Sequence, residues 1–395
     1  MRSAFTMAAA RTRASFRSKA IFRFASFNFD AVERRASGVA LRPWRSRRCS
    51  ASTRDRELFV TANPNAALDA GRDLTSAEAQ ALCDAMLRGS FSDQAAAEVL
   101  VRLAEKGETP EEVHGFVVSL LSHAERVPFE GPTVDMCGTG GSGLVRFNVS
   151  TTVAFVVAAG GLCVAKHGNR GSSRPNGSFD LLAALGVRID LDGPAVAACL
   201  SQIGVGFIYA RRFHPVLKRL VEARKLAARR TIFNLAAPLS NPSRVRAQVV
   251  GAATSSTAVT VARCLALLGV QHGLVISGNS GIDDVDLSGP VTLHSANPGA
   301  GATLLDPTTL GLARVPYDEL PGGDADVNCT LFLQLLDGRA PQALRELVCL
   351  SAALVFSTAG RVSSLPEGLA LASDLLAGGA ARDKFAEYRS FVSHL

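Results

Sequence analysis

Two glycine-rich segments, separated by one apolar run, hold most of the side chains that could bind a charged ligand. The first has the sequence GTGGSG over 138–143, directly after a short apolar strand, and Asn148, Ser150 and Thr151 follow where a helix should begin. Glycines let consecutive backbone N–H groups converge on one anion, and the free amides and hydroxyls of a helix start bind the same anion. This pattern predicts a phosphate-binding loop, although a glycine-rich turn alone could also be only a tight connection.

The second segment, KHGNR over 166–170, follows a nearly pure hydrophobic run over 153–165. That run is too short to cross a bilayer, so it predicts a buried helix that leads into a strand. Lys166, His167 and Asn169 then leave the same strand end, where open α/β sheets bind ligands. The alternative is structural, because a lysine at a strand end often only extends to solvent and a lone histidine after an apolar run is usually packed.

Two adjacent carboxylates, Asp283 and Asp284, follow another predicted strand. Carboxylates beside a diphosphate repel each other unless a hard cation bridges them, and Mg²⁺ with oxygen ligands fits that role. The alternative is an aspartate cluster that only forms a turn. As loop residues, both carboxylates are expected to be exposed and to add little to stability.

The elements that must position these residues begin with a helical part over residues 74 to about 127. It contains three helix starts: a capping box over 75–78, Ser92-Asp93, and Thr109-Pro110. The apolar side chains at helical spacing fit a core or an oligomer face equally. They are Leu82, Met86, Ala97, Leu100 and Leu103.

From Val134, short apolar strands alternate with segments of helical length, which predicts a sheet covered by helices. A long insertion with helical periodicity, Arg211 to about Val249, follows the strand that ends at Tyr209, and helices return from Asn328 to Leu395. The strands are expected at 134–137, 162–166, 187–191, 205–209 and 273–277.

The predicted fold class is therefore α/β, with a small N-terminal helical domain and a larger domain whose central mixed or parallel sheet is flanked by helices. The expected divisions are a leader over 1–56, the helical domain over 57–129 joined by part of 211–249, and the α/β domain over 130–395.

The positive charge is concentrated in the leader. The 395-residue chain is 47% hydrophobic and has a formal net charge of +7, but residues 1–56 hold 14 Lys+Arg against 3 Asp+Glu. The remainder is slightly acidic, so a general nucleic-acid-binding surface is not supported. The leader lacks acidic residues before Asp30 and is rich in Arg, Ser, Ala and Phe, which predicts an organellar transit peptide. The alternatives are a disordered basic tail and sequence upstream of the true start.

Eight cysteines occur singly, without any CxxC spacing. This usage is typical of small buried residues in a reducing compartment and favours neither a disulfide framework nor a zinc site.

In this order and spacing, GTGGSG, FNVST and AKHGNR closely resemble the anthranilate phosphoribosyltransferase family of tryptophan biosynthesis. The resemblance extends from about Leu74 to the C-terminus. It is also carried by LTSAEAQALCDAMLRGSFSD, EKGETPEEVHGF, HPVLKRL, RTIFNLAAPLSNPSR, GIDDVDLSG and LPGGDADVN. It implies transfer of the phosphoribosyl group of 5-phosphoribosyl 1-diphosphate to anthranilate, with Mg²⁺, giving N-(5-phosphoribosyl)anthranilate and diphosphate.

The resemblance also implies which residues bind each substrate. The residues implied for phosphoribosyl diphosphate are Gly138, Thr139, Gly140, Gly141, Asn148, Ser150, Thr151, Lys166, Ser173 and Arg174. Those implied for anthranilate are Gly138, His167, Asn169 and Arg224, and those implied for the metal are Asp283, Asp284 and Ser150. No general acid or base is assigned, because positioning and neutralisation of the leaving group would supply most of the rate.

The same resemblance implies a homodimer through the helical domain, no nucleic acid or membrane partner, and a location in the plastid after the transit peptide is removed, with the mitochondrion as the second choice. Two other readings stay open at this point. One is a pyrimidine nucleoside phosphorylase, which shares the architecture. The other is a diverged, inactive relative that binds nucleic acid, against which the acidic body and the retained KHGNR argue.

Four places depart from the family pattern. Ser142 stands where the family usually has Asp, and Arg174-Pro175-Asn176 stands where it has Ser-Lys-Ser. Asp283-Asp284 replaces the usual Asp-Glu, and Phe213 stands where Tyr is common. Arg174 could supply the missing lysine charge, and Asp286 could supply the acid lost at Ser142.

Overall fold

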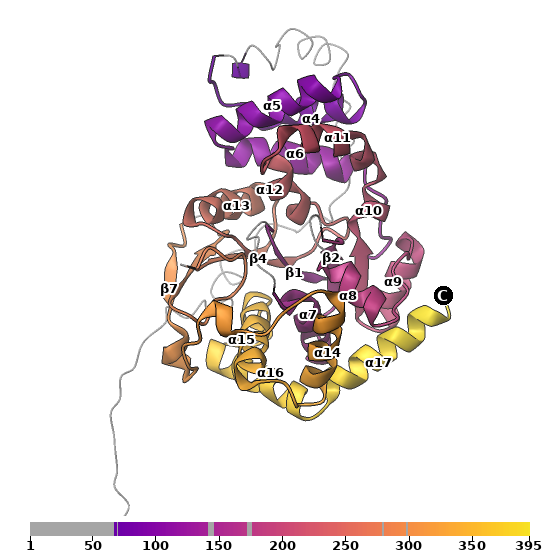
Figure 1. Ribbon diagram of the computed structural model, residues 1–395, viewed down its shortest axis with the longest axis vertical. Helices are drawn as coiled ribbons and strands as arrows, with labels where there is room; N and C mark the ends of the chain where they lie inside the picture. The colour runs from indigo at the N-terminus through magenta and orange to yellow at the C-terminus, as the bar shows by residue number, and fades with distance from the viewer. Residues whose placement is uncertain (1–66, 69, 141–145, 172–175, 279, 298) are drawn as a thin grey trace, which may run out of the picture. The chain divides into compact units, whose positions relative to one another are not determined.

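The structure is a computed structural model that describes residues 67–68, 70–140, 146–171, 176–278, 280–297 and 299–395 (Figure 1). The chain divides into two compact units, 1–50 and 51–395, and every described residue belongs to the second. The predicted transit peptide therefore lies outside the described residues.

The three N-terminal helices begin where their capping residues predict. Thr75 caps α4 (Ser76–Leu87), Ser92 caps α5 (Asp93–Lys106), and Thr109 caps α6 (Pro110–Ser122). In each case the side-chain oxygen of the cap accepts a backbone N–H that the first turn leaves without a partner. The sequence prediction of these three starts is confirmed.

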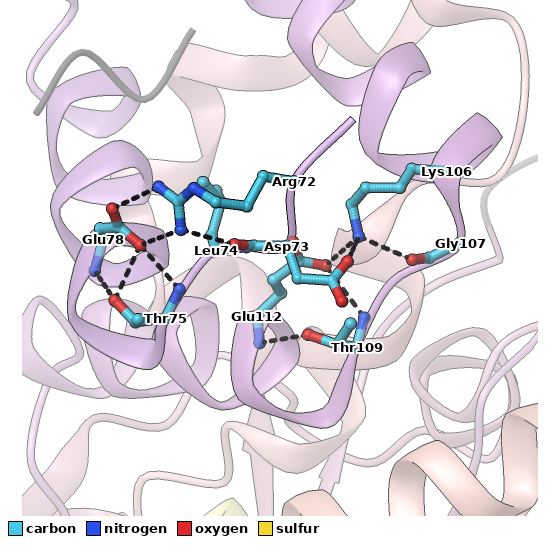
Figure 2. Close-up of polar contacts among 9 residues, drawn as sticks. All are labelled: Arg72, Asp73, Leu74, Thr75, Glu78, Lys106, Gly107, Thr109 and Glu112. Atoms are coloured by element: carbon cyan, nitrogen blue, oxygen red, sulfur yellow. Dashed lines mark hydrogen bonds and ion pairs between the residues drawn. The ribbon is translucent and has the colours of Figure 1, made fainter. Parts of the chain in front are cut away.

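Figure 2 shows the start of α4. Glu78 closes the capping box by accepting the N–H of Thr75 at 2.9 Å, and its other oxygen accepts Arg72 Nη2 at 2.7 Å. The hydrogen bonds from Arg72 are the main reason why the pKa of Glu78 falls to about 2. One carboxylate thus satisfies the helix start and an arginine from the chain before it.

Glu112 at the start of α6 has a wider role, also visible in Figure 2. Its buried carboxylate accepts the N–H groups of Thr109 and of Leu74, both at 2.9 Å, and pairs with Lys106 Nζ at 3.0 Å. Since Lys106 ends α5 and Leu74 leads into α4, this single side chain joins the ends of all three helices.

Two helices from a later part of the chain complete the helical domain. α11 (Val221–Ala227) packs on α5, and α12 (Ile232–Leu239) packs on α6. The apolar side chains that were predicted at helical spacing lie inside the shared core, none more than 3% exposed. They are therefore core residues and not an oligomer face.

The larger domain is built on a mixed seven-stranded sheet of order β3-β2-β1-β4-β5-β6-β7. The first five strands in this order are parallel, and β6 and β7 run antiparallel at one edge. In chain order the strands are β1 (Val134–Gly138), β2 (Val164–Gly168), β3 (Val205–Tyr209), β4 (Ala247–Gly251), β5 (His272–Ser277), β6 (Val291–Ser295) and β7 (Thr303–Leu305). Strand order reverses between β1 and β4, so the crevice at their carboxyl ends is a topological switch point.

Two strand predictions are wrong. Residues 187–191 form no strand, because this extended connection pairs with no neighbouring strand within the described chain. The strand β4 was missed, because the predicted helical insertion runs to about Val249 and covers its first residues, yet β4 lies at the centre of the sheet. Its five residues are all buried, so the run lacks the alternation that marks a half-exposed strand and is too short to be told from a helix segment.

Helices from the C-terminal part cover one face of the sheet together with α7, and α13 packs against β5 and β6 on the other (Figure 1). Phe155 of α7 lies at the centre of the larger core, with its ring 5.4 Å from Phe207, 5.8 Å from Phe332 and 5.3 Å from Phe385. The prediction of C-terminal helices after Asn328 is confirmed. The helices are α7 (Val149–Ala159), α8 (Ser178–Ala184), α9 (Gly193–Gln202), α10 (Ala210–Phe213), α13 (Ser255–Leu267), α14 (Ala325–Leu336), α15 (Gln342–Thr358), α16 (Leu365–Ala377) and α17 (Ala380–Ser393).

Across the described ranges, no helix combines the length and the hydropathy that crossing a bilayer requires. The seven cysteines in those ranges are free thiols, and five of them are buried.

Candidate active site

The switch point between β1 and β4 is covered by the turn that carries the acidic pair. A Cβ atom on Gly138, the last residue of β1, would overlap Oδ2 of Asp283, and one on Gly251, the last residue of β4, would overlap the carbonyl oxygen of Asp283. Only glycine permits so close an approach. The structure therefore brings the first glycine-rich segment and Asp283 together, as the sequence predicted from separate motifs.

Gly140 is held from two sides. Its φ is +71°, a backbone region that favours glycine, and its N–H donates to Oδ2 of Asp283. Its carbonyl oxygen accepts Arg230 Nη1 at 2.6 Å, and the carbonyl of Thr139 accepts the other nitrogen at 3.2 Å. The sequence analysis gave Arg230 no role, although it lies in the motif RTIFN.

The two adjacent aspartates have different surroundings. Asp283 is 2% exposed and pairs with Arg146 at 2.8 Å, whereas Asp284 is half-buried and accepts only the N–H of Val285, at 2.9 Å, among the described residues. Burial raises the pKa of Asp284 to about 6, in spite of the attraction of Arg146. The expectation that both carboxylates are exposed is wrong for Asp283, because the turn is pressed onto the glycines below it.

This pair could hold a divalent cation only with further ligands. In the part of the chain that the structure describes, no group of three or more His, Cys, Asp or Glu side chains is arranged so that it could hold a metal ion by itself. Mg²⁺ commonly binds through one or two carboxylates and completes its shell with substrate phosphates and water. Asp284 fits this kind of site, because burial disfavours its negative charge and it would supply one of the few carboxylates that bind the ion.

The start of α7 faces this region with hydrogen-bonding groups to spare. Asn148 is its N-cap but makes no capping bond, because its amide donates to the carbonyl of Asn176 at 3.1 Å and its oxygen accepts from Asn328 at 2.9 Å. The hydroxyl of Thr151 is buried without a partner among the described residues. The N–H of Val149 donates to the carbonyl of Phe147 at 3.0 Å, so the amides of Ser150 and Thr151 are the ones that an anion could bind.

Lys166 lies below this loop in a buried polar cluster. Its ammonium donates to the carbonyl of His167 at 2.8 Å and lies 3.8 Å from Oδ1 of Asp135. Asn241 donates to the other oxygen of Asp135 at 3.0 Å. A cavity of about 10 Å³ lies beside Asp135, Lys166 and Ser150, but most of its lining is apolar. Asp135 and Asn241 were missed, although an acid inside an apolar strand is itself a signal.

His167 contacts a second buried imidazole. Its ring lies 5.3 Å from that of His214, edge to face, and its Nε2 has no hydrogen-bond partner among the described residues. Burial, together with the nearby His214 and Lys166, holds the pKa of His167 well below its ordinary value. Burial likewise lowers the pKa of His214 to about 4, so both rings are neutral at pH 7. His214 belongs to the motif HPVLKRL but was given no role.

The remaining described candidates are more exposed. Asn169 uses its side-chain oxygen to accept the N–H of Arg170 at 2.8 Å. Asp180 accepts the N–H groups of Gly171 and Gly177, at 2.8 and 2.9 Å, in the connection that follows KHGNR. Arg224, on α11, lies 5.8 Å above the ring of Phe233, and no contact joins it to His167 or Asn169 in the described structure. The structure thus does not bring Arg224 to the other anthranilate candidates.

Several predicted residues lie outside the described ranges: Gly141, Ser142, Ser173, Arg174 and Pro175. Asp286, the proposed substitute for the acid lost at Ser142, is 1% exposed and accepts the N–H of Ser288 at 2.8 Å. Phe213 is fully buried in the core of the larger domain.

Comparison with known proteins gives a consistent result. Residues 130–382 match the α/β domain of the glycosyl transferase family, and residues 66–124 match the helical bundle domain of that family. The chain is 42% identical over 321 residues to the anthranilate phosphoribosyltransferase of Thermomicrobium roseum, a match that covers 80% of this chain and 92% of that protein. The corresponding protein of Roseiflexus sp. strain RS-1 is 41% identical over 313 residues, with 79% and 92% covered.

Solved structures agree. The crystal structure of anthranilate phosphoribosyltransferase from Thermus thermophilus matches with a TM-score of 0.80 and 36% identity, covering 84% of this chain and 100% of that chain. The Saccharomyces cerevisiae protein, solved in complex with PRPP and Mg, matches in fold with a TM-score of 0.74 and 23% identity, covering 82% and 94%.

Proposed function

This chain belongs to the anthranilate phosphoribosyltransferase family, and we propose that it transfers the phosphoribosyl group of 5-phosphoribosyl 1-diphosphate to anthranilate in tryptophan biosynthesis. The observation that carries the proposal is the turn of Asp283 seated on Gly138 and Gly251, with Gly140 held between Asp283 and Arg230. An anion-binding loop and an acidic pair therefore meet at the switch point of the sheet, as a diphosphate leaving group requires.

The chemistry needs binding and charge more than proton transfer. C1 of the ribose loses diphosphate through a cationic, oxocarbenium-like state, the anthranilate nitrogen forms the new bond to C1, and the amine releases one proton to solvent. The glycine-rich loop and the start of α7 bind the leaving diphosphate, and Lys166 adds a positive charge. A neutral His167, kept so by burial, places no cation beside the developing positive charge on the sugar.

Anthranilate is assigned to the side of the site that faces the helical domain. His167 and Asn169 offer hydrogen bonds, and Arg224 is the cation that would pair with the carboxylate. No contact joins Arg224 to these two residues in the described structure, so its pairing with the carboxylate requires Arg224 to come closer to them when substrate binds. Such a movement is typical of enzymes that exclude water before they form a reactive cation.

Mg²⁺ is the implied cofactor, and the yeast relative was solved with PRPP and Mg. Asp283, Asp284 and Ser150 would hold it, together with oxygens of the substrate. The ion supplies neutralisation of the developing charge on the diphosphate. Asp283 already pairs with Arg146, so Asp284 is the carboxylate that is free to change partners.

Two further assignments rest on the sequence. The leader over 1–56, with 14 Lys+Arg and 3 Asp+Glu, supports a transit peptide for the plastid. A homodimer through the helical domain is supported by the exposed apolar side chains Val221 and Leu226 of α11, which are 49% and 48% exposed. Import into isolated plastids and sedimentation of the purified protein test these assignments separately.

The reaction itself is tested by mixing the purified protein with anthranilate, phosphoribosyl diphosphate and Mg²⁺ and following the product by mass spectrometry. We expect product that disappears with a chelator and returns with added Mg²⁺. Cleavage of a pyrimidine nucleoside by phosphate would favour the phosphorylase reading. Binding of nucleic acid without product would favour the inactive relative, and either result would contradict the proposal.

A further inference from the structure

The side chain of Asn328, on α14, contacts the chain just before α7 and just before α8. It is fully buried, and its amide nitrogen lies 2.8 Å from the carbonyl oxygen of Arg146, 2.9 Å from Oδ1 of Asn148 and 2.9 Å from Oδ1 of Asn176. Its own oxygen accepts the N–H of Gly323 at 2.9 Å. A residue from the C-terminal part of the chain therefore meets segments more than 150 positions away, and all its polar atoms are used.

The three asparagines form one network. Besides its bond from Asn328, Asn148 donates to the carbonyl of Asn176 at 3.1 Å, and Asn176 donates to the carbonyl of Arg146 at 3.1 Å. Gly322 packs on the same backbone, where a Cβ atom would lie 2.5 Å from the nitrogen of Phe147. The approach of α14 is thus close enough to fix the chain on either side of Asn148.

This network determines what the start of α7 presents. An N-cap asparagine ordinarily turns its oxygen onto the amides of its own helix, but that oxygen of Asn148 accepts from Asn328. The amides of the first turn are consequently not satisfied by the cap. If Asn148 were released, its side chain could fold back and cap α7, and it would then compete with a bound phosphate.

We propose that Asn328 is a positioning residue for phosphoribosyl diphosphate, which keeps Asn148 off the start of α7 and fixes it against Asn176. The inference rests on the proposed function, because it names what prepares the anion-binding end of that site. Asn328 touches no substrate in this arrangement. It acts only through the two asparagines, and so its loss affects the phosphate-binding side of the site and not the anthranilate side.

The test uses the full chain with Asn328→Asp and Asn328→Ala, and with Thr330→Ala as the matched control. Thr330 lies two positions along α14, is exposed and bonds only the carbonyl of Asp326, at 3.2 Å. Aspartate keeps the shape of the side chain and the oxygen that accepts from Gly323. It replaces the amide nitrogen with an oxygen that faces three other oxygens, so Asn328→Asp should perform no better than Asn328→Ala. We expect KM for phosphoribosyl diphosphate to rise about tenfold in both variants, KM for anthranilate to change less than twofold, and the control to match the wild type.

Direct binding gives a readout that does not depend on turnover. Calorimetric titration of phosphoribosyl diphosphate with Mg²⁺ into the same variants should show about the same tenfold loss. If the role of Asn328 is only structural, the variants melt at lower temperature but keep both wild-type KM values, and this outcome would overturn the inference.

Asn176→Ala provides a second route, since it leaves α14 intact even where Asn328 variants fail to fold. Its effect on KM for phosphoribosyl diphosphate should be similar, and combining it with Asn328→Ala should add little, because both changes release the same side chain. Fully additive effects would contradict the network. A wild-type protein that forms no product would instead refute the proposed function, so the two failures are distinguishable.

Discussion

At the scale of single residues, the neighbours Asp283 and Asp284 show that adjacent carboxylates need not be equivalent. Asp283 is buried against Arg146 and the N–H of Gly140, while Asp284 carries a charge that burial disfavours. A carboxyl whose pKa is raised to about 6 adds folding stability only at low pH. It loses that contribution as pH rises through 6.

We therefore expect Asp283→Asn and Asp284→Asn to differ. Both should reduce Mg²⁺-dependent turnover. Only Asp283→Asn should also lower the free energy of unfolding, by about 1–3 kcal/mol, because the guanidinium of Arg146 loses its charged partner. Asp284→Asn should leave stability unchanged or slightly higher at pH 7.5. Urea unfolding beside a Mg²⁺ titration of activity checks this, and equal losses of stability in the two variants would contradict it.

Lys166 and Asp135 pose a second question at this scale, because the lysine that we propose to bind substrate is also part of a buried ion pair. Burial raises the pKa of Asp135, although Lys166 opposes the shift. Removing the lysine alone would leave a buried acid without its cation, so a loss of activity could not be assigned to substrate binding.

The prediction is that Lys166→Met lowers the free energy of unfolding by about 3 kcal/mol and that adding Asp135→Asn restores most of it. The double variant should fold but use phosphoribosyl diphosphate poorly. Chemical denaturation of the two single variants and the double variant measures the coupling. If the losses of unfolding free energy are additive, the ion pair between Lys166 and Asp135, 3.8 Å apart, contributes nothing to stability.

The sequence marks candidate ligand-binding residues more readily than the residues that hold those candidates in place. Gly138, Gly140 and the Asp283 pair stand in short motifs whose types already indicate phosphate and metal chemistry. Arg230 and Asn328 act on backbone carbonyls and on other amides far along the chain, and nothing in their local sequence marks those contacts. Such roles depend on which distant segments meet, and the fold alone determines that.

At the scale of elements, helix starts were predictable and strand assignments were less so. Thr75, Ser92 and Thr109 each satisfy amides within three residues, so the signal is local. β4 depends on pairing with β1 and β5, which come from distant parts of the chain. The alternating residues 187–191 resembled a strand but found no partner. Helix caps can be predicted from neighbouring residues, whereas a strand forms only where another strand supplies its backbone hydrogen bonds.

Glu78 gives the element-scale prediction. Its pKa is about 2 in the folded chain and about 4.5 ordinarily, so the stability it contributes is present above pH 4.5 and is lost as pH falls toward 2. Glu78→Gln should lower the free energy of unfolding by about 1 kcal/mol at pH 7, and the difference from the wild type should shrink between pH 5 and 3. Denaturant unfolding across this range is the measurement.

Glu98→Gln is the matched control, because Glu98 is an exposed glutamate on α5 that accepts only from Gln94. Its substitution should have little effect at any pH in this range. A difference between Glu78→Gln and the wild type that stays constant from pH 7 to 3 would contradict the role of the charged cap.

At the scale of the whole molecule, the described fold lies within the unit 51–395, and its first capped helix begins after Thr75. Deleting residues 1–50 should therefore leave the melting temperature and the turnover of the protein unchanged. Deleting residues 1–90 is the contrasting control, because it removes α4, which packs along α6. Loss of activity or of cooperative melting in the shorter deletion would show that the leader belongs to the fold.

The helical domain is assembled from two stretches that the chain makes at different times. α4 to α6 end at Ser122, but Phe233 of α12, whose ring packs 5.3 Å from that of Phe116, is translated only after strands β1 to β3. At about 5–20 residues per second, the apolar face of α6 leaves the ribosome roughly ten seconds before its partner exists. A nascent chain of this protein thus exposes that face of α6 until α12 has been made.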